Sequence, residues 1–203
     1  MWHHTLRVGG LIFFIYIIII AKPGSSLFSF HPVLMTFAFI LSMTEALFIF
    51  SKNGLASGSL YSTRITMHWL VISLVAVTHG LGYAAIYYNK IVNNKPHFIS
   101  WHGWIGLAAS ILFWIQLSLG IFAKYPKLLQ RFLEAKKVKA SHALYGMLIF
   151  LTGMSAMILG LWSTWFATNA SLIAFYLALG LCLLLSGTIG LKFIKKHGPV
   201  LVK

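Results

Sequence analysis

Four histidines, His31, His68, His102 and His142, lie at or near the start of four different apolar stretches. An imidazole at membrane depth is costly unless a ligand or a partner offsets its burial, so such residues are expected to be functional. Imidazole is also the commonest metal ligand among side chains. One histidine from each of four helices therefore predicts a metal cofactor held between the helices.

The composition indicates a protein embedded in a lipid bilayer. The chain has 203 residues, of which 59% are apolar and 9% are charged, and its mean hydropathy is +0.86. A soluble domain carries roughly 25% charged residues. We therefore expect one all-α integral membrane domain over residues 1–203, with no soluble module. The net charge of +14 is explained by basic residues that flank membrane spans, and no nucleic-acid partner is expected.

Six segments are apolar enough to cross a bilayer core, which needs about 20 residues per helix. The first is expected to be an uncleaved span, because no small-residue cleavage site follows it. Pro32 is expected near a helix N-terminus, where its missing N–H costs little, and residues 164–169 are expected to form a short loop. The predicted spans are residues 6–22, 31–50, 65–88, 99–122, 142–162 and 171–193.

The basic residues predict the orientation. Cytoplasmic connections concentrate Lys and Arg, and thirteen of the sixteen lie on one side of the spans, so both termini are predicted to be cytoplasmic. The three on the other side are Lys22, Lys90 and Lys95. The thirteen are Arg7, Lys52, Arg64, Lys124, Lys127, Arg131, Lys136, Lys137, Lys139, Lys192, Lys195, Lys196 and Lys203.

The direction of each span assigns the histidines to two depths. His31 and His102 begin spans that run inward, so they are expected in the outer leaflet; His68 and His142 begin spans that run outward, so they are expected in the inner leaflet. Much of the ~30 Å hydrocarbon thickness separates the two levels. The possible pairs are therefore His31 with His102, the outer pair, and His68 with His142, the inner pair.

A histidine pair on facing helices can supply both axial ligands of a haem iron. Such an iron has no open position, which favours electron transfer, and haems at two depths would connect the two faces of the membrane. Zinc normally takes four protein ligands, or three and a water. The chain contains no CxxCH sequence, so c-type attachment is excluded. Gly106 and Gly146, each four residues after a histidine, would leave room for a macrocycle or simply allow close helix packing.

Two segments, Ser29-Phe-His31-Pro-Val-Leu-Met35 and Ser100-Trp-His102-Gly-Trp-Ile-Gly106, resemble the cytochrome b561 family, as do the six spans with one histidine near the end of each of spans two to five. The resemblance covers nearly the whole chain. It implies two non-covalent b haems bound by the four histidines in a central four-helix bundle. It also implies cytoplasmic ascorbate as donor and monodehydroascorbate radical or a ferric chelate as acceptor. Members commonly form homodimers, and the implied location is the endoplasmic reticulum or a vesicle membrane.

The substrate residues follow the family pattern less closely. Ascorbate-specific members carry a basic residue two positions before the third-span histidine, where this chain has Thr66. Arg64 and Lys139 flank the inner pair and would attract the ascorbate anion, although membrane topology explains them equally well. Lys95 and His97 precede the outer His102 and are candidates to bind the acceptor, unless they are simply solvated loop residues.

Two other functions remain open: a haem-containing membrane anchor that passes electrons to quinone, and a haem-free transporter or scaffold. Two further polar residues lie inside spans. His79 is expected to form a hydrogen bond within the bundle, to bond a haem propionate or to act as a rival ligand. Glu45 is expected near the inner pair, either responding to reduction by taking up a proton or forming an interhelical hydrogen bond as a neutral carboxyl.

Overall fold

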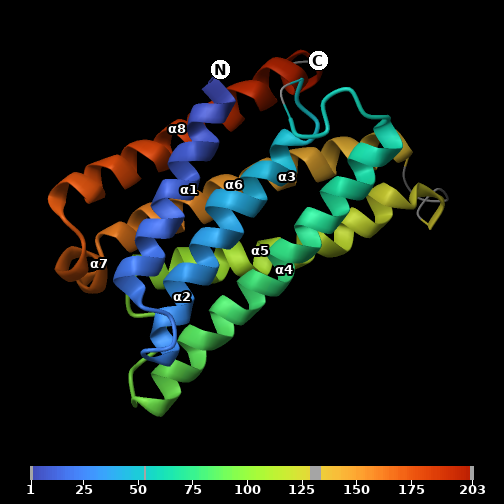
Figure 1. The fold of residues 1–203 in the computed structure, drawn as a ribbon. Helices are drawn as coiled ribbons and strands as arrows, with labels where there is room; N and C mark the ends of the chain where they lie inside the picture. Colours follow the sequence, from blue (N-terminus) through green and yellow to red (C-terminus); the bar gives the residue numbers. More distant parts are fainter. Residues whose placement is uncertain (1, 53, 129–133, 202–203) are drawn as a thin grey trace.

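The computed structural model describes residues 2–52, 54–128 and 134–201 and shows no strand within them. Arg131 and Lys203, two of the basic residues used to predict the orientation, lie outside this part of the chain. Figure 1 shows the helical elements in order. They are α1 (Trp2–Ala21), α2 (Leu27–Thr36), the π-helix η1 (Phe37–Met43), α3 (Thr44–Phe48), α4 (Tyr61–Val92), α5 (Trp101–Lys124), the 3₁₀ turn η2 (Pro126–Leu128), α6 (Ala135–Leu161), α7 (Thr164–Asn169) and α8 (Leu172–Leu201).

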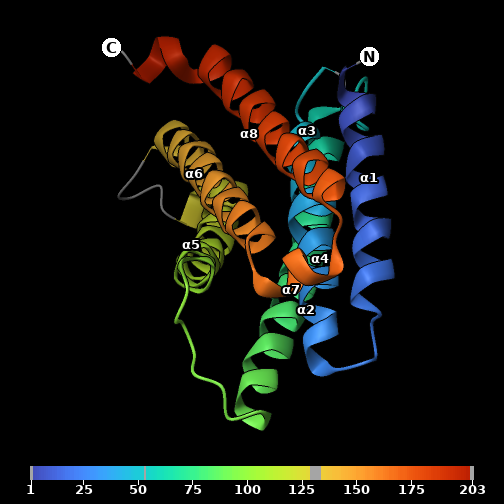
Figure 2. The same ribbon diagram turned by 90° about the vertical axis from the view of Figure 1, so that its left-hand side faces the viewer.

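In the part of the chain that the structure describes, six helical segments are long and apolar enough to cross a membrane, which confirms the predicted all-α, six-span fold. Both termini lie at the same end of the molecule as the α3–α4 connection, and the α1–α2 and α4–α5 connections lie at the opposite end (Figures 1 and 2). The six segments are His4–Ala21, Leu27–Phe48, Tyr61–Val92, Trp101–Lys124, Ala135–Leu161 and Leu172–Lys195.

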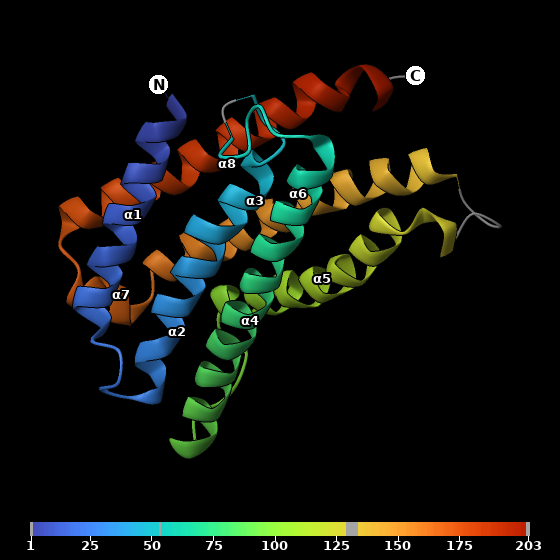
Figure 3. The same cartoon turned by 45° about the vertical axis from the view of Figure 1, so that its right-hand side comes forward.

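The centre of the molecule is made of two helix pairs. α2 packs along α4, and α5 packs along α6, as Figure 3 shows. α1 contacts α2 on the outside of the first pair, and α8 contacts α6 on the outside of the second. Large apolar side chains are buried between the helices, among them Phe48, Phe150 and Met154. The four helices that carry the histidines therefore form the core, and α1 and α8 flank them.

The helix that carries His31 starts earlier than expected. Ser26 caps α2 by accepting a hydrogen bond from the Ser29 amide (3.2 Å), so the helix begins at Leu27 and not at His31. Pro32 consequently lies in the second turn of α2, near the helix N-terminus but one turn further into the helix than expected. Its missing N–H leaves the carbonyl of Phe28, four residues earlier, without its usual helical donor.

Helical structure also extends beyond the apolar stretches elsewhere. α4 begins seven residues before His68, and α6 begins seven residues before His142, so both histidines lie about two turns inside their helices. The expected loop at residues 164–169 is instead the short helix α7, capped by Ser163, which accepts from the Phe166 amide (3.2 Å). The early starts of α4 and α6 are explained by their basic residues, because Lys and Arg are good helix formers and a helix can continue where hydropathy falls.

Glu45 forms an ion pair with Arg7 of α1. The Arg7 Nη2 group donates to Glu45 Oε2 (2.9 Å), and Arg7 Nε donates to the other carboxylate oxygen. Both side chains are about 80% buried, with exposed fractions of 19% and 20%. The contact is interhelical, as expected, and its partner is the guanidinium of Arg7.

Removing one partner of this ion pair is expected to destabilise the protein. The Arg7→Met variant leaves the Glu45 carboxylate without its guanidinium, and stranding a buried charge in this way costs about 3 kcal/mol. Thermal unfolding in detergent measures the loss. The double variant Arg7→Met/Glu45→Met removes both charges and should recover most of the stability; if it is as unstable as the single variant, the ion pair does not account for the effect.

Candidate haem-binding sites

The four histidines meet as two pairs in the core. The rings of His31 (α2) and His102 (α5) have centroids 6.1 Å apart and planes at 80°. Those of His68 (α4) and His142 (α6) have centroids 6.5 Å apart and planes at 84°. These are the outer and inner pairs expected from the span directions.

Three of these histidines have Nδ1 within hydrogen-bond distance of a backbone carbonyl. A carbonyl only accepts, so Nδ1 carries the proton in each of them, and Nε2 keeps a free lone pair. Metal-binding histidines typically use this arrangement, in which a second partner fixes the tautomer and the ring orientation. The three contacts are His31 with the carbonyl of Gly82 (3.0 Å), His68 with that of Ala46 (3.0 Å) and His102 with that of Ala156 (2.8 Å).

Within each helix pair the support is reciprocal. α4 carries His68 at the inner level and, 14 residues later, Gly82, whose carbonyl holds His31 of α2 at the outer level. α6 repeats this spacing with His142 and Ala156, whose carbonyl holds His102. Fourteen helical residues span about 21 Å. The two histidine pairs are therefore about this far apart along the helices, which is too far for one metal ion to join them.

The π-helix explains the one exception to this spacing. In the helix formed by α2, η1 and α3, His31 and Ala46 are 15 residues apart, one more than in the other helices. A π segment inserts an extra residue into a helix and is frequent at functional sites. The η1 segment, Phe37–Met43, lies between the two residues. It takes up the additional residue, and both residues thus face α4.

The outer pair borders a cavity of about 360 Å³ with mostly apolar walls. Gly106, one turn after His102, lines the cavity, and a Cβ added there would have no atom within 4 Å. The room beside His102 therefore fits the expectation of space for a flat macrocycle. Gly146 leaves no such space beside His142. A Cβ there would lie 3.1 Å from Nε2 of Gln116, which already occupies that space.

A second pair of glycines lies opposite two of the histidines across the α5–α6 interface. A Cβ on Gly160 of α6 would lie 3.2 Å from Cε1 of His102, and a Cβ on Gly120 of α5 would lie 3.3 Å from Cε1 of His142. Both contacts would be tighter than most real Cβ contacts. Each glycine thus lets the histidine of the facing helix come close to the backbone.

The donor set fits haem and does not fit a protein-only metal site. Within residues 2–52, 54–128 and 134–201, no three or more His, Cys, Asp or Glu side chains converge. Two imidazoles on opposite sides of one metal, each bonded at about 2 Å, would place their ring centroids about 6 Å apart. The observed 6.1 and 6.5 Å agree with this value. A macrocycle between the rings would supply the remaining ligands.

His79 forms the hydrogen bond within the bundle that was one of its expected roles. Its Nε2 lies 2.9 Å from Oγ of Ser110, whose hydroxyl donates to the carbonyl of Gly106 (2.8 Å). The side chain is 1% exposed and packs against the rings of Phe39 and Phe113. Its Nδ1 is buried, has no hydrogen-bond partner in the described part of the chain, and belongs to a residue lining the outer cavity.

The basic residues predicted to flank the inner pair lie one turn from it. Arg64 precedes His68 by four residues in α4, and Lys139 precedes His142 by three in α6, so each shares a helix face with its histidine. Arg64 is half-buried, and its Nε atom is buried without a hydrogen-bond partner among the described residues. Lys139 is exposed.

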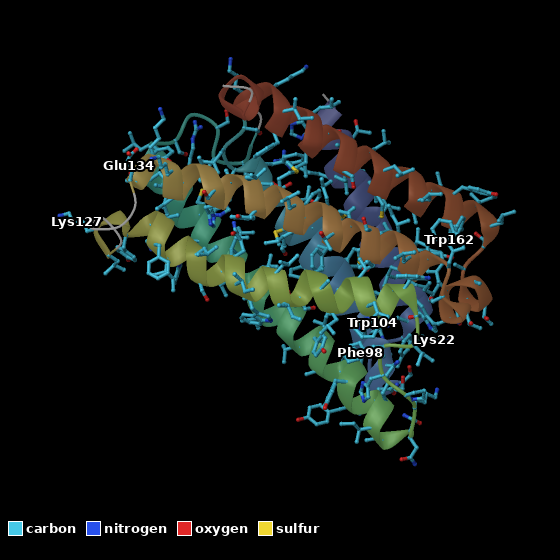
Figure 4. The ribbon with its side chains drawn as sticks, turned by 180° about the vertical axis from the view of Figure 1, so that it is seen from behind. Lys22, Phe98, Trp104, Lys127, Glu134 and Trp162 are labelled. Atoms are coloured by element: carbon cyan, nitrogen blue, oxygen red, sulfur yellow. The ribbon has the colours of Figure 1, made fainter. Side chains whose placement is uncertain are left out.

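At the opposite end, His97 lines the outer cavity, and its ring centroid lies 4.7 Å from that of Tyr87. Lys95 is exposed and does not line the cavity. Lys90 lines it instead, with its ammonium donating to the carbonyl of Pro96 (2.7 Å). Figure 4 shows this end through Phe98 and Trp104, which lie far from Lys127 and Glu134 at the other end of the molecule.

Gln116, Gly120 and Gly160 were not among the residues predicted from the sequence. A signal was present, because His102, Gly106 and Gly120 recur 40 residues later as His142, Gly146 and Gly160, and Ala156 stands at the position that corresponds to Gln116. The prediction rested only on the first half of this repeat, the histidine and the glycine four residues after it. Gln116 is also an amide in the middle of an apolar span, which is itself an indication of function.

The chain is similar in sequence to known transmembrane proteins. Residues 30–167 match the sequence model of the family described as eukaryotic cytochrome b561. The chain is 39% identical over 187 residues to transmembrane reductase CYB561D2 of Homo sapiens, covering 92% of this chain and 82% of the relative. It is 33% identical over 179 residues to probable transmembrane reductase CYB561D1 of Mus musculus, covering 88% of this chain and 76% of that relative. The chain belongs to the eukaryotic cytochrome b561 family, whose members are haem-b membrane proteins.

Proposed function

We propose that this transmembrane reductase takes electrons from ascorbate at the cytoplasmic face and delivers them to monodehydroascorbate radical or a ferric chelate at the other face. The observation that supports this best is the presence of two imidazole pairs about 21 Å apart along the helices. A single haem site would leave most of the membrane uncrossed. Two sites in series connect its faces.

Each histidine pair has a defined part in this proposal. His31 and His102 would hold the outer haem b, and His68 and His142 the inner one. When bound, the haems supply reversible one-electron chemistry. The carbonyls of Gly82, Ala46 and Ala156 keep three of the imidazoles in the tautomer that leaves Nε2 free.

The charged residues at the two ends would select the substrates. Arg64, whose Nε has no hydrogen-bond partner among the described residues, and Lys139 would attract the ascorbate anion one turn beyond the inner pair. Ascorbate leaves as monodehydroascorbate after losing one electron and one proton. At the far end, His97 and Lys90 line the outer cavity and would bind an anionic acceptor, which gains one electron. Both termini would then be cytoplasmic, at the same end as Arg64.

Electron transfer into vesicles tests the proposal. Purified protein is reconstituted into liposomes that enclose ferricyanide, and ascorbate is added outside. Wild-type protein is expected to reduce the enclosed acceptor, while protein-free liposomes are not. The protein inserts into liposomes in both directions. Protease added outside cleaves only the molecules whose Lys- and Arg-rich end faces outward, so loss of activity after digestion shows that these molecules carry the electrons.

The outcomes separate the proposed function from its alternatives. Reduction by the chain alone argues against a membrane anchor that needs a partner subunit and quinone. Haem-containing protein that ascorbate fails to reduce would contradict ascorbate as donor. Protein without haem would support the transporter or scaffold.

A further inference from the structure

His142 is the one histidine of the two pairs whose Nδ1 faces a side chain in place of a backbone carbonyl. Nε2 of Gln116 lies 3.0 Å from His142 Nδ1 and also donates to the His142 carbonyl. Gln116 occupies the position in α5 that Ala156 occupies in α6. At the outer level the helix backbone therefore supports His102, and at the inner level a rotatable amide supports His142.

This difference matters because an amide can present either a donor or an acceptor. In the orientation seen here, the amide nitrogen faces Nδ1, so Nδ1 accepts and the imidazole proton lies on Nε2. An imidazole in that tautomer has no lone pair on Nε2 with which to bind iron. The Gln116 oxygen, Oε1, is meanwhile buried and has no hydrogen-bond partner among the described residues.

The space around Gln116 is built for this side chain. It is 9% exposed, and its amide nitrogen lies where a Cβ on Gly146 would come within 3.1 Å. Gly120, one turn further along α5, allows the ring of His142 to approach the backbone. Any larger residue at either glycine would push the amide or the ring out of place.

We propose that Gln116 is the positioning residue of the inner site: when haem is bound, its amide turns so that Oε1 accepts a hydrogen bond from His142 Nδ1–H. The turn moves the proton-bearing nitrogen of His142 from Nε2 to Nδ1 and frees Nε2 for iron. It also requires the amide to shift away from the His142 carbonyl. This inference rests on the proposed function only in taking His142 as an inner haem ligand.

A hydrogen bond accepted from Nδ1–H makes an imidazole a stronger donor to the metal and so stabilises ferric iron. Replacing Gln116 with leucine removes the acceptor. The Gln116→Leu variant is therefore expected to raise the reduced-to-oxidised ratio of the inner haem about tenfold at a fixed potential, a shift of about 59 mV for one electron. Its inner-site haem affinity is expected to fall about 10–100-fold. The outer haem should change in neither respect.

A conservative variant separates hydrogen bonding from packing. Gln116→Glu keeps an oxygen opposite Nδ1, so it should retain the inner haem with a potential no higher than that of wild type. Ser118→Ala, an exposed position two residues further along α5, is the matched control and should behave as wild type. Redox titration of the purified full-length proteins, with haem titration of the haem-free forms, measures both properties.

The result that supports the proposal is a raised or lost inner signal in Gln116→Leu together with a retained, unraised signal in Gln116→Glu. The proposal is overturned if both variants lose the inner haem, if both shift its potential upward, if neither shifts it, or if the outer haem shifts equally. A wild-type protein that binds no inner haem would instead contradict the proposed function, so the two failures are distinguishable.

Discussion

Replacing His68 with alanine is expected to remove the inner haem and leave the outer one in place. His68 is one half of the inner pair, whose ring centroids are 6.5 Å apart, so in its absence His142 alone would be left to hold the haem. Changes around a metal ligand already cost about 10–100-fold in affinity, so loss of the ligand itself should cost about 100-fold or more. Haem content should fall from two per chain to one, and ascorbate-driven reduction should fall to background.

The reciprocal variant shows whether the loss is specific to one level. His31→Ala should remove the outer haem, and ascorbate should still reduce the inner haem without passing electrons to the far side. Low-temperature reduced-minus-oxidised spectra and redox titration distinguish the two centres. If His68→Ala and His31→Ala affect the same centre, or each affects the opposite one, the pairing is wrong.

The glycines opposite the ligands are expected to give an equally selective result. In Gly160→Val, the new side chain begins 3.2 Å from His102 Cε1 and 3.3 Å from its Nδ1, so the ring must move and its bond to the Ala156 carbonyl must weaken. We expect a loss of about 10–100-fold in outer-haem affinity. In Gly120→Val, the same argument applies to His142, and the inner haem should be affected.

Gly180→Val is the matched control for both glycine variants. Gly180 lies in α8, where an added Cβ meets nothing within 4 Å, so the variant adds the same bulk without touching a ligand. Haem titration of the four proteins measures the affinities. Equal weakening of both sites in Gly160→Val would show general unfolding of the bundle and would contradict the specific contact.

The pairing of the histidines was predictable from the sequence because it depends on span direction alone. His31 and His102 begin spans of one direction, and His68 and His142 begin spans of the other, so membrane depth excludes every other pair. The six spans were predictable because an apolar segment of about 20 residues has the length and composition of a helix that crosses the bilayer core.

The support of the ligands was not predictable in the same way. Three of the four histidines have a backbone carbonyl as the partner of Nδ1, at Ala46, Gly82 and Ala156. Every residue has a backbone carbonyl, so the residue type does not reveal which carbonyl is the partner. The π-helix is equally hidden, because Phe37–Met43 is an apolar run with no residue that marks a widened turn. The 15-residue spacing between His31 and Ala46 indicates the extra residue of the π-helix. That spacing can be interpreted only when the contacts of both residues with α4 are known.

The helix limits differ from the predicted ones for a related reason. Hydropathy locates the apolar stretches, and the helices of this chain extend beyond those stretches. Arg64 and Lys139 belong to the first turns of α4 and α6 and not to connecting loops. This places them on the same helix faces as His68 and His142, which a loop would not do, and gives them fixed positions one turn beyond the inner pair.

The haem-to-protein ratio of the purified wild-type chain tests the central claim most directly. Quantitative haem analysis against protein concentration, read together with the reduced-minus-oxidised spectrum, counts the six-coordinate centres. Two histidine pairs about 21 Å apart predict two haems per chain, both six-coordinate. A ratio of one, or a five-coordinate spectrum at either centre, would contradict the account.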